Sequence, residues 1–332
     1  MGATTTSLHG VWAAVPTPWD AAGSLAEGIL ERNIDRYAGA AVDGVYTTDS
    51  DGEFYAIELD QFRHLVDVFA RRMQCHGLEA AVGVTWSHTA GIVDRINVAL
   101  EAGISIVHVA FPAWMPLAPG DIDRFFSDLA GAAPGARWVH YNTSLSRILL
   151  TGKDYARLAA TYPEQLIGTK QGATDLMQFA EIIEESPQLA HFGVEYNAVL
   201  TYVLGGKGVY SYWVNVLPGW ERTWIDACEA GDWEMAWRMQ RKLWLWERTY
   251  IAPTIRQAGH ASGILGKARA ALSHFLEDTG NTKAPYYPVN PEMLTSVRDS
   301  FRRFWADELR AESFEPTCGS ELEGGKTFED CR

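Results

Sequence analysis

The chain has 332 residues, of which 47% are hydrophobic and 21% charged, and its formal net charge is -14. A chain of this length can bury a large core, and the composition is that of an ordinary globular protein. The negative charge and the absence of a Lys/Arg cluster argue against a nucleic-acid partner, because the phosphates would be repelled.

Signals for a membrane or for secretion are not evident in the sequence. The N-terminal MGATTTSLHG lacks the basic and apolar regions of a signal peptide, and no run of about eighteen apolar residues occurs. The four cysteines, Cys75, Cys228, Cys318 and Cys331, form no CxxC pair and have no histidines at metal-ligand spacing. We therefore expect a cytoplasmic protein that contacts no membrane.

Short β-rich runs alternate with amphipathic helical patterns along the chain. We expect eight strands, at Gly10–Val15, Gly44–Thr48, Ala80–Val84, Ile106–Ala110, Trp138–Tyr141, Leu166–Lys170, His191–Val194 and Gly208–Trp213. Helical spacing of apolar residues marks the segments between them, for example Phe62, Leu65, Val66 and Phe69. Eight alternating units predict an α/β fold, a (β/α)8 TIM barrel over residues 1–230. The alternative, an open doubly wound sheet, would need a G-x-G-x-x-G turn, which is absent.

The barrel pattern is followed by a predicted C-terminal helical extension over residues 231–311. Its helical patterns are Trp233–Ile251, Ala261–Asp278 and Pro291–Leu309. The first of them carries an aromatic stripe that we interpret as a packing face, formed by Trp233, Trp237 and Trp244. The remainder, residues 312–332, is polar and Gly-rich, which predicts a disordered tail.

Lys170 is the first candidate for chemistry, because active-site groups of such barrels lie at the C-terminal ends of strands. It ends the sixth predicted strand and shares one face with Leu166 and Gly168. If that face points into the barrel, burial lowers the pKa of the amine. A neutral amine can attack a ketone and form an imine. The alternative is a surface lysine at the edge of a loop.

Tyr141 ends the fifth predicted strand, next to the strand of Lys170. Its hydroxyl can pass protons or hold an oxyanion on the same substrate atom. The alternative is an aromatic residue of the barrel core. His140 alternates with Tyr141, so we expect it to face outward and to pack against helices.

Two other segments could suggest a bound ion. The loop after the second strand offers hydroxyls, but its Asp49, Asp51 and Gly52 lack the further ligands of a calcium loop. The glycine-rich segment 205–208 precedes the eighth strand, at the opposite end of the barrel, and is predicted to be a tight turn. No H-E-x-x-H or histidine cluster occurs. No metal or other cofactor is therefore expected.

Several motifs occur in a characteristic order: Val15-Pro16-Thr17-Pro18, Asp51-Gly52-Glu53, Tyr141-Asn142, Gly168-Thr169-Lys170 and Gly205-Gly206-Lys207-Gly208-Val209. With them the chain, from about Gly10 to Leu309, resembles the dihydrodipicolinate synthase / N-acetylneuraminate lyase family of class I aldolases. The resemblance implies a (β/α)8 barrel with a C-terminal helical addition. It also implies a homo-oligomer, either a tetramer or a dimer. The binding partner that it implies is a small-molecule 2-oxo acid, the substrate.

The resemblance assigns roles to individual residues. Lys170 matches the imine-forming lysine, Tyr141 the proton-relaying tyrosine, and Ser50 the first of two hydroxyl residues that hold the substrate carboxylate and relay protons. Asp51 stands at the second hydroxyl position, where its charge would repel a carboxylate unless it is paired or turned away.

The segment after the fourth strand departs from the biosynthetic synthases. They carry a Tyr-Tyr pair where this chain has Trp114, which donates no hydroxyl proton. A Pro-x-Trp here, with segments 267–269 and 285–287, resembles hydratase-aldolases that cleave aryl-substituted oxobutenoates to an aldehyde and pyruvate. Segment 52–55, in contrast, resembles that of sugar-acid dehydratases. We expect Trp114 to border the pocket and to contact the distal group of the substrate.

Four further residues are predicted to bind substrate. Arg147 lies one position beyond the arginine with which synthases grip a carboxylate. Glu195 replaces a glycine expected after the seventh strand, and either an acid–base role or a place at the rim is open to it. Asn142 and Tyr210 complete the predicted site.

The sequence thus predicts a Schiff-base-forming lyase on 2-oxo acids, a hydratase-aldolase or retro-aldolase that releases pyruvate and an aldehyde. One alternative is a dehydratase or aldolase for 2-keto-3-deoxy sugar acids. Others are a condensation of the dihydrodipicolinate synthase type and a catalytically inactive binding protein.

Overall fold

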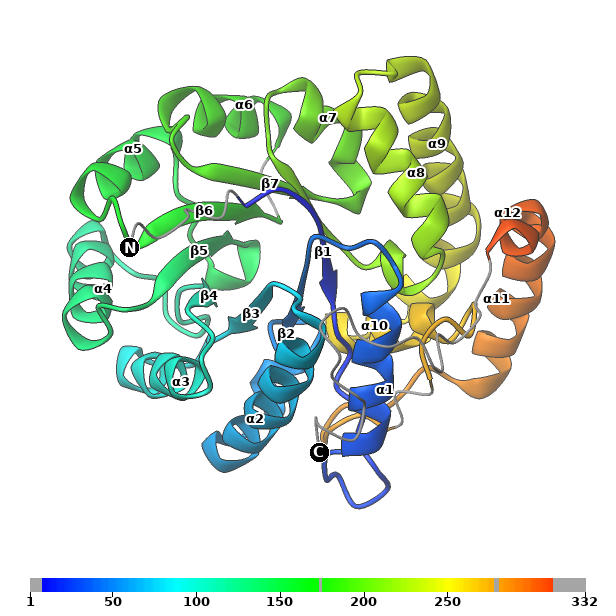
Figure 1. The fold of residues 1–332 in the computed structure, drawn as a ribbon, viewed down its shortest axis with the longest axis horizontal. Helices are drawn as coiled ribbons and strands as arrows, with labels where there is room; N and C mark the ends of the chain where they lie inside the picture. The colour runs from blue at the N-terminus through cyan, green and yellow to red at the C-terminus, as the bar shows by residue number, and fades with distance from the viewer. Residues whose placement is uncertain (1–7, 173–174, 278–280, 313–332) are drawn as a thin grey trace.

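The computed structural model describes residues 8–172, 175–277 and 281–312. Eight parallel strands close into a barrel in chain order, and β8 pairs with β1 (Figure 1). They are β1 (Gly10–Ala14), β2 (Gly44–Thr47), β3 (Ala80–Gly83), β4 (Ile106–Val109), β5 (Arg137–Asn142), β6 (Leu166–Gln171), β7 (Ala190–Val194) and β8 (Gly208–Ser211). The predicted (β/α)8 fold is confirmed.

Helices surround the barrel and connect successive strands (Figure 1). They are α1 (Glu27–Ala38), α2 (Leu59–His76), α3 (Thr89–Glu101), α4 (Pro119–Ala132), α5 (Gly152–Thr161), α6 (Leu176–Glu185), α7 (Ala198–Val203) and α8 (Pro218–Glu229). The apolar stripe predicted for α2 is buried. The helix is capped at its C-terminal end by Gly77, whose φ of 64° suits a glycine. Short 3-10 turns follow four strands: η1 (Phe54–Ala56), η2 (Ser144–Ser146), η3 (Glu195–Asn197) and η4 (Trp213–Asn215).

Side chains alternate along each strand between two cores. Outward residues such as Val45, Val107 and Val209 belong to the large core beneath the helices. Inward residues fill the barrel with a second, smaller core of Leu8, Trp12, Ala14, Tyr46, Ala81, Ile106, Val139, Phe192, Tyr210 and Tyr212. His140 faces outward as predicted, and its Nδ1 lies 2.7 Å from the Tyr155 hydroxyl of α5. The predicted strand alternation is therefore the observed one.

Most of the C-terminal extension lies on one side of the barrel, beyond α8 (Figure 1). It comprises α9 (Trp233–Trp246), a π-helix η5 (Glu247–Arg256), α10 (Ser262–Ala270), α11 (Pro291–Phe304) and α12 (Ala306–Ala311). The expected aromatic packing face of α9 is wrong in part, because Trp233 is 39% exposed. The helix instead buries its neighbouring face, Ala236, Met239, Gln240, Leu243 and Trp246.

A buried ion pair joins the extension to the barrel. Lys267 Nζ of α10 lies 2.5 Å from Glu53 Oε1, in the loop after β2. Trp19 Nε1 donates to the same oxygen at 3.1 Å, and the backbone N–H of Lys283 donates to Glu53 Oε2 at 2.9 Å. Lys267 also donates to the carbonyl of Asn281 at 2.6 Å. The Gly-Glu motif of this loop is thus one of the contacts between the two parts of the chain.

Several expectations lie beyond what one chain shows. The tail predicted to be disordered falls outside the described residues, except Glu312, which accepts hydrogen bonds from the first backbone N–H groups of α8. In the described ranges no helix combines the length and apolarity needed to cross a bilayer. The division into barrel and extension, the homo-oligomer and the cytoplasmic location stay predictions.

Candidate active site

Lys170 lies at the centre of the barrel, near the C-terminal end of β6. Its side chain is 3% exposed, so the alternative of a surface lysine is wrong. Three tyrosine rings surround the amine: Nζ lies 4.5 Å from the ring centroid of Tyr46, 4.3 Å from that of Tyr141 and 5.0 Å from that of Tyr210. The amine thus lies in a dry, aromatic site at the C-terminal ends of the strands, where active sites of this fold are found.

The protonation state expected for Lys170 is corrected by a neighbouring carboxylate. Nζ donates to Asp49 Oδ2 at 3.3 Å and to the Tyr46 hydroxyl at 3.1 Å. Burial lowers the pKa of Lys170, but the charge of Asp49, with Tyr141 and Asp51 beyond it, outweighs burial and raises the pKa above its usual value. The resting side chain is therefore an ammonium ion, and the predicted low pKa is wrong.

Asp49 is itself held by a buried histidine. His108 Nδ1 lies 2.8 Å from Asp49 Oδ2, and His108 Nε2 lies 3.0 Å from the Tyr210 hydroxyl. Burial lowers the pKa of His108, so the ring is neutral. We assign its proton to Nδ1, which donates to Asp49, while Nε2 accepts from Tyr210. Burial favours neutral Asp49, but Lys170 and His108 together hold its pKa below the usual value.

A strained turn presents Asp49 to the barrel. Thr48 and Asp49 have φ values of 64° and 51°, in the left-handed region, which costs on the order of 1–3 kcal/mol for each such residue. The Thr48 hydroxyl donates to the carbonyl of Gly83 at 2.5 Å. A Cβ atom at Gly83 would lie 2.3 Å from Asp49 Oδ1 and 2.5 Å from Asp49 N. The Thr17 hydroxyl holds the far end of the turn by donating to the carbonyl of Gly52 at 3.0 Å.

The structure brings together the three predicted catalytic residues. Tyr141 stands opposite Lys170 in the register of β5 and β6. Burial raises the pKa of Tyr141, although Lys170 and a hydrogen bond with Ser50 oppose the rise, so its hydroxyl is protonated and able to donate. Ser50 is 6% exposed. A hydroxyl pair beside the amine can carry the proton transfers that imine chemistry needs.

Two acidic residues near this cluster, Asp51 and Glu195, have raised pKa values. Burial and the nearby charge of Asp49 raise the pKa of Asp51. Glu195 opens η3 after β7 and is 7% exposed. Burial raises the pKa of Glu195 to about 7, against the opposing charge of Arg269 from α10. Arg269 in turn donates to Glu247 Oε2 at 3.0 Å. Glu195 can therefore exchange protons near neutral pH, and the proton affinity of Asp51 is raised in the same direction.

Other predicted contacts are not at the centre of the site. The Asn142 amide is bonded to the backbone of Leu150 and to the Gln171 side chain, and its contact with substrate stays a prediction. Arg147 is exposed, with a left-handed φ of 58°. Trp114 is 78% exposed on the loop after β4.

Tyr210 is also displaced from its predicted role. It is 2% exposed and lies beneath Lys170, with its hydroxyl bound to His108 instead of directed at the entrance. The sequence alone did not indicate that Asp49, His108 and Tyr46 belong to this site. Strand alternation could have identified the last two, because Tyr46 and His108 occupy inward positions between outward valines and threonines.

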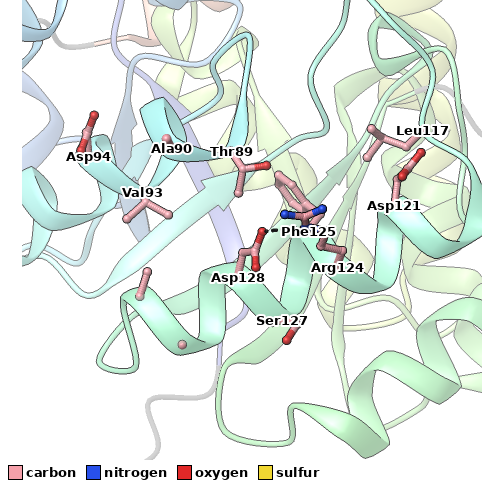
Figure 2. A pocket seen from close by; sticks show the side chains of 12 residues that line it. Thr89, Ala90, Val93, Asp94, Leu117, Asp121, Arg124, Phe125, Ser127 and Asp128 are labelled. Carbon is pink, nitrogen blue, oxygen red and sulfur yellow. Dashed lines mark ion pairs between the residues drawn. The ribbon is translucent and has the colours of Figure 1, made fainter.

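A surface groove between α3 and α4 is separate from this cluster (Figure 2). Its lining comes from residues 89–94 and 117–132 and includes an ion pair of 3.7 Å between Arg124 and Asp128. None of the groups around Lys170 lines it. No three His, Cys, Asp or Glu side chains of the described ranges gather into a metal site. The groups equipped for chemistry are those inside the barrel.

Solved structures share this fold. A prophage protein of the dihydrodipicolinic acid synthase family from E. coli K12, in complex with pyruvate, superposes with a TM-score of 0.80 at 19% identity, covering 90% of this chain and 98% of that one. A catalytic lysine mutant of the Ruminococcus gnavus sialic acid aldolase superposes with a TM-score of 0.82 at 16% identity, covering 93% and 99%. At these identities the likeness concerns the fold.

Sequence relatives define the family. The 4-hydroxy-tetrahydrodipicolinate synthase of Desulfotalea psychrophila is 22% identical over 301 residues, 90% of this chain and 97% of that protein. The N-acetylneuraminate lyase of Escherichia fergusonii is 27% identical over 240 residues, 71% and 79% of the two chains. The model of the dihydrodipicolinate synthetase family matches residues 7–299. The chain therefore belongs to the dihydrodipicolinate synthetase family, whose members are lyases of the class I aldolase type.

Proposed function

We propose that this protein is a Schiff-base-forming lyase that cleaves a 2-oxo acid and releases pyruvate, with Lys170 as the nucleophile. The observation that carries the proposal is the buried amine of Lys170 with the Tyr141 ring 4.3 Å away. The pyruvate bound to one structural neighbour, and the catalytic lysine of another, support it.

The reaction follows from these groups. Deprotonated Lys170 adds to the C2 carbonyl, and loss of water gives an iminium whose nitrogen is cationic. In a 2-oxobutenoate, water first adds across the C3=C4 double bond of the iminium and places a hydroxyl group on C4. The C4 hydroxyl then loses its proton as the C3–C4 bond breaks, the electron pair of that bond passes into the iminium to form an enamine, and the aldehyde leaves. Protonation at C3 and addition of water release pyruvate and restore the amine. Tyr141 and Ser50 are the groups placed to move protons in these steps.

The substrate carboxylate has a place beside Ser50. Asp51 repels a substrate carboxylate less than an ordinary aspartate would, because its raised pKa increases the fraction of neutral acid. A neutral Asp51 donates a hydrogen bond to a carboxylate instead of repelling it. We therefore assign Ser50 and Asp51 to the carboxylate end of the substrate.

Two candidates remain for the distal end. The aryl group inferred from Trp114 stays a prediction, since Trp114 is 78% exposed and no described residue covers it. Glu195 favours a second candidate, the dehydration of a 2-keto-3-deoxy sugar acid. With a pKa of about 7, it can protonate a departing hydroxyl group.

Trapping of the imine tests the proposal. Incubation with pyruvate and borohydride should attach a reduced pyruvyl group to the peptide that contains Lys170, detected by mass spectrometry. Lys170→Ala should give no adduct and no turnover. An unlabelled Lys170, or a Lys170→Ala protein with full activity, would show that the proposal is wrong.

A substrate panel separates the two candidates. Aryl-substituted 2-oxobutenoates should be cleaved faster than 2-keto-3-deoxy aldonates if Trp114 binds the distal group, and Trp114→Ala should then raise KM. Turnover of the sugar acids alone, lost in Glu195→Gln, would instead establish the dehydratase.

A further inference from the structure

We propose that Asp49, held in place by His108 and Tyr210, is the fixed counter-ion of the Lys170 nitrogen, both as the resting ammonium and as the iminium of the covalent intermediate. The inference rests on the proposed function, because it assigns a second group to the same imine. Its basis is the contact of 3.3 Å between Lys170 Nζ and Asp49 Oδ2 inside the barrel.

The carboxylate is fixed from several strands at once. Asp49 comes from the turn after β2, His108 from β4 and Tyr210 from β8, joined by contacts of 2.8 Å and 3.0 Å. The side chains of Asp49 and His108 are both fully buried. Because the barrel is closed around them, Asp49 Oδ2 cannot follow a nitrogen that moves away. The geometry therefore favours reactions in which the nitrogen stays in place and stays cationic.

The proton balance requires one transient acceptor, and Asp49 Oδ1 is suited to it. No described group donates to this buried oxygen. The ammonium of Lys170 passes one proton to Asp49, which leaves a neutral amine and a neutral acid. The amine adds to the substrate carbonyl, and a proton moves from nitrogen to oxygen in the carbinolamine. The proton on Asp49 then leaves with that oxygen as water, so the carboxylate is ionised again when the iminium forms.

Asp49 is the principal source of negative charge at the nitrogen. The titratable groups that face Lys170 are Tyr46, Asp49, Asp51, His108, Tyr141 and Tyr210. Burial keeps the three tyrosines and His108 neutral. Of the two aspartates, Asp51 forms no hydrogen bond with Lys170 and has a raised pKa. Removal of the charge at Asp49 should therefore make Lys170 lose its proton at lower pH.

The test is the pH dependence of imine trapping. The rate of borohydride trapping of pyruvate on Lys170 should rise with pH, and in Asp49→Asn its midpoint should lie about one to three units lower than in the parent. Turnover of Asp49→Asn should fall, because its iminium lacks a counter-ion. Asp51→Asn is the comparison variant: it makes the same substitution two residues away, at an acid whose raised pKa leaves less charge to remove, and should give a smaller shift of the midpoint. His108→Gln, which loosens Asp49, should shift the midpoint in the same direction.

The outcomes distinguish this inference from the proposed function. If the parent forms no adduct on Lys170, the proposed function fails. If the parent forms the adduct and Asp49→Asn keeps the parental midpoint, the counter-ion is wrong and the proposed function stands. Should Asp49→Asn fail to fold, as judged by circular dichroism, His108→Gln decides: a lower midpoint supports the inference and an unchanged one overturns it.

Discussion

Two buried lysine–carboxylate pairs in this chain have contrasting surroundings. Glu53, paired with Lys267, receives hydrogen bonds on both oxygens, from the Trp19 indole and the Lys283 backbone as well as from the lysine. Asp49, paired with Lys170, receives two donors on Oδ2 and none from the described residues on Oδ1. Both oxygens of Glu53 thus accept hydrogen bonds, whereas Asp49 Oδ1 accepts none from the described residues.

The difference separates structure from chemistry. A buried charge is stable only when its hydrogen bonds are complete, and a complete network is rigid. Glu53 meets that condition and holds the extension against the barrel. The pair of Lys170 and Asp49 is stabilised less fully, because its groups must also exchange protons with a ligand. We therefore call Lys170 and Asp49 the functional pair, whose loss should lower turnover, and Lys267 and Glu53 the structural pair, whose loss should lower stability.

The largest expected effect is on turnover, from the tyrosine whose ring lies 4.3 Å from Lys170 of the functional pair. Tyr141→Phe should lower turnover by roughly a hundred- to ten-thousandfold, the range for loss of a general acid–base group, while some adduct still forms on Lys170. Tyr155→Phe is the matched control, because it removes a buried hydroxyl on the outer face of β5. Steady-state kinetics measure both. A Tyr141→Phe enzyme within a few-fold of the parent would disprove the assigned role.

The structural pair should respond in the opposite way. Lys267→Met leaves Glu53 buried without its cation, which should lower the free energy of unfolding by about 3–5 kcal/mol. Denaturation in urea measures the loss, with the exposed Lys153→Met as control. Imine trapping by the folded variant should remain within a few-fold of the parent. Lost trapping at unchanged stability would place Lys267 in the functional class.

A carboxylate without a paired lysine gives a smaller, pH-dependent effect. The folded pKa of Glu195 is about 7, above its ordinary 4.5, so the folded state binds the proton more tightly. Its stabilising contribution is complete below pH 4.5 and is lost as the pH rises through 7. In the parent, the free energy of unfolding should therefore fall by on the order of 1–3 kcal/mol between pH 4.5 and 7, and in Glu195→Gln this fall should be absent. The exposed Glu234→Gln should keep it, and equal slopes in the two variants would contradict the raised pKa.

The smallest expected effect is that of chelation. Neither pair holds a metal ligand cluster among the described residues, and in the proposed mechanism the imine supplies the electron sink. Turnover in EDTA should therefore equal turnover without it. Activity that falls in EDTA and returns with a divalent ion would demand a different mechanism for Lys170.

The fold was largely accessible from the sequence, because alternation and helical spacing are local signals. Each predicted strand overlaps the observed one. The eighth strand was predicted to reach Trp213, but the observed β8 ends at Ser211 and Trp213 begins η4. The face of α9 was harder to predict. Trp233 is apolar and correctly spaced, but it lies at the first turn of the helix, where the core no longer reaches it.

The site was accessible only in part. Lys170 and Tyr141 could be identified because strand ends and family motifs mark them. The pKa of Lys170 could not, because Asp49 is 121 residues away along the chain and its turn follows from the packing of β2 against β3. The partner of Asn142 was inaccessible for a related reason: Gln171, at 3.0 Å, is brought to it by the register of β5 and β6.

Gly83 has a bearing on how such a site can change over evolutionary time. It takes no part in the chemistry, yet any side chain there would collide with the backbone and the carboxylate of Asp49. A lineage that acquired alanine at this position would lose the left-handed turn, and with it the acid beneath Lys170, in a single step. The two positions are thus coupled by sterics, and a change of the acid at position 49 that keeps this turn requires glycine at position 83.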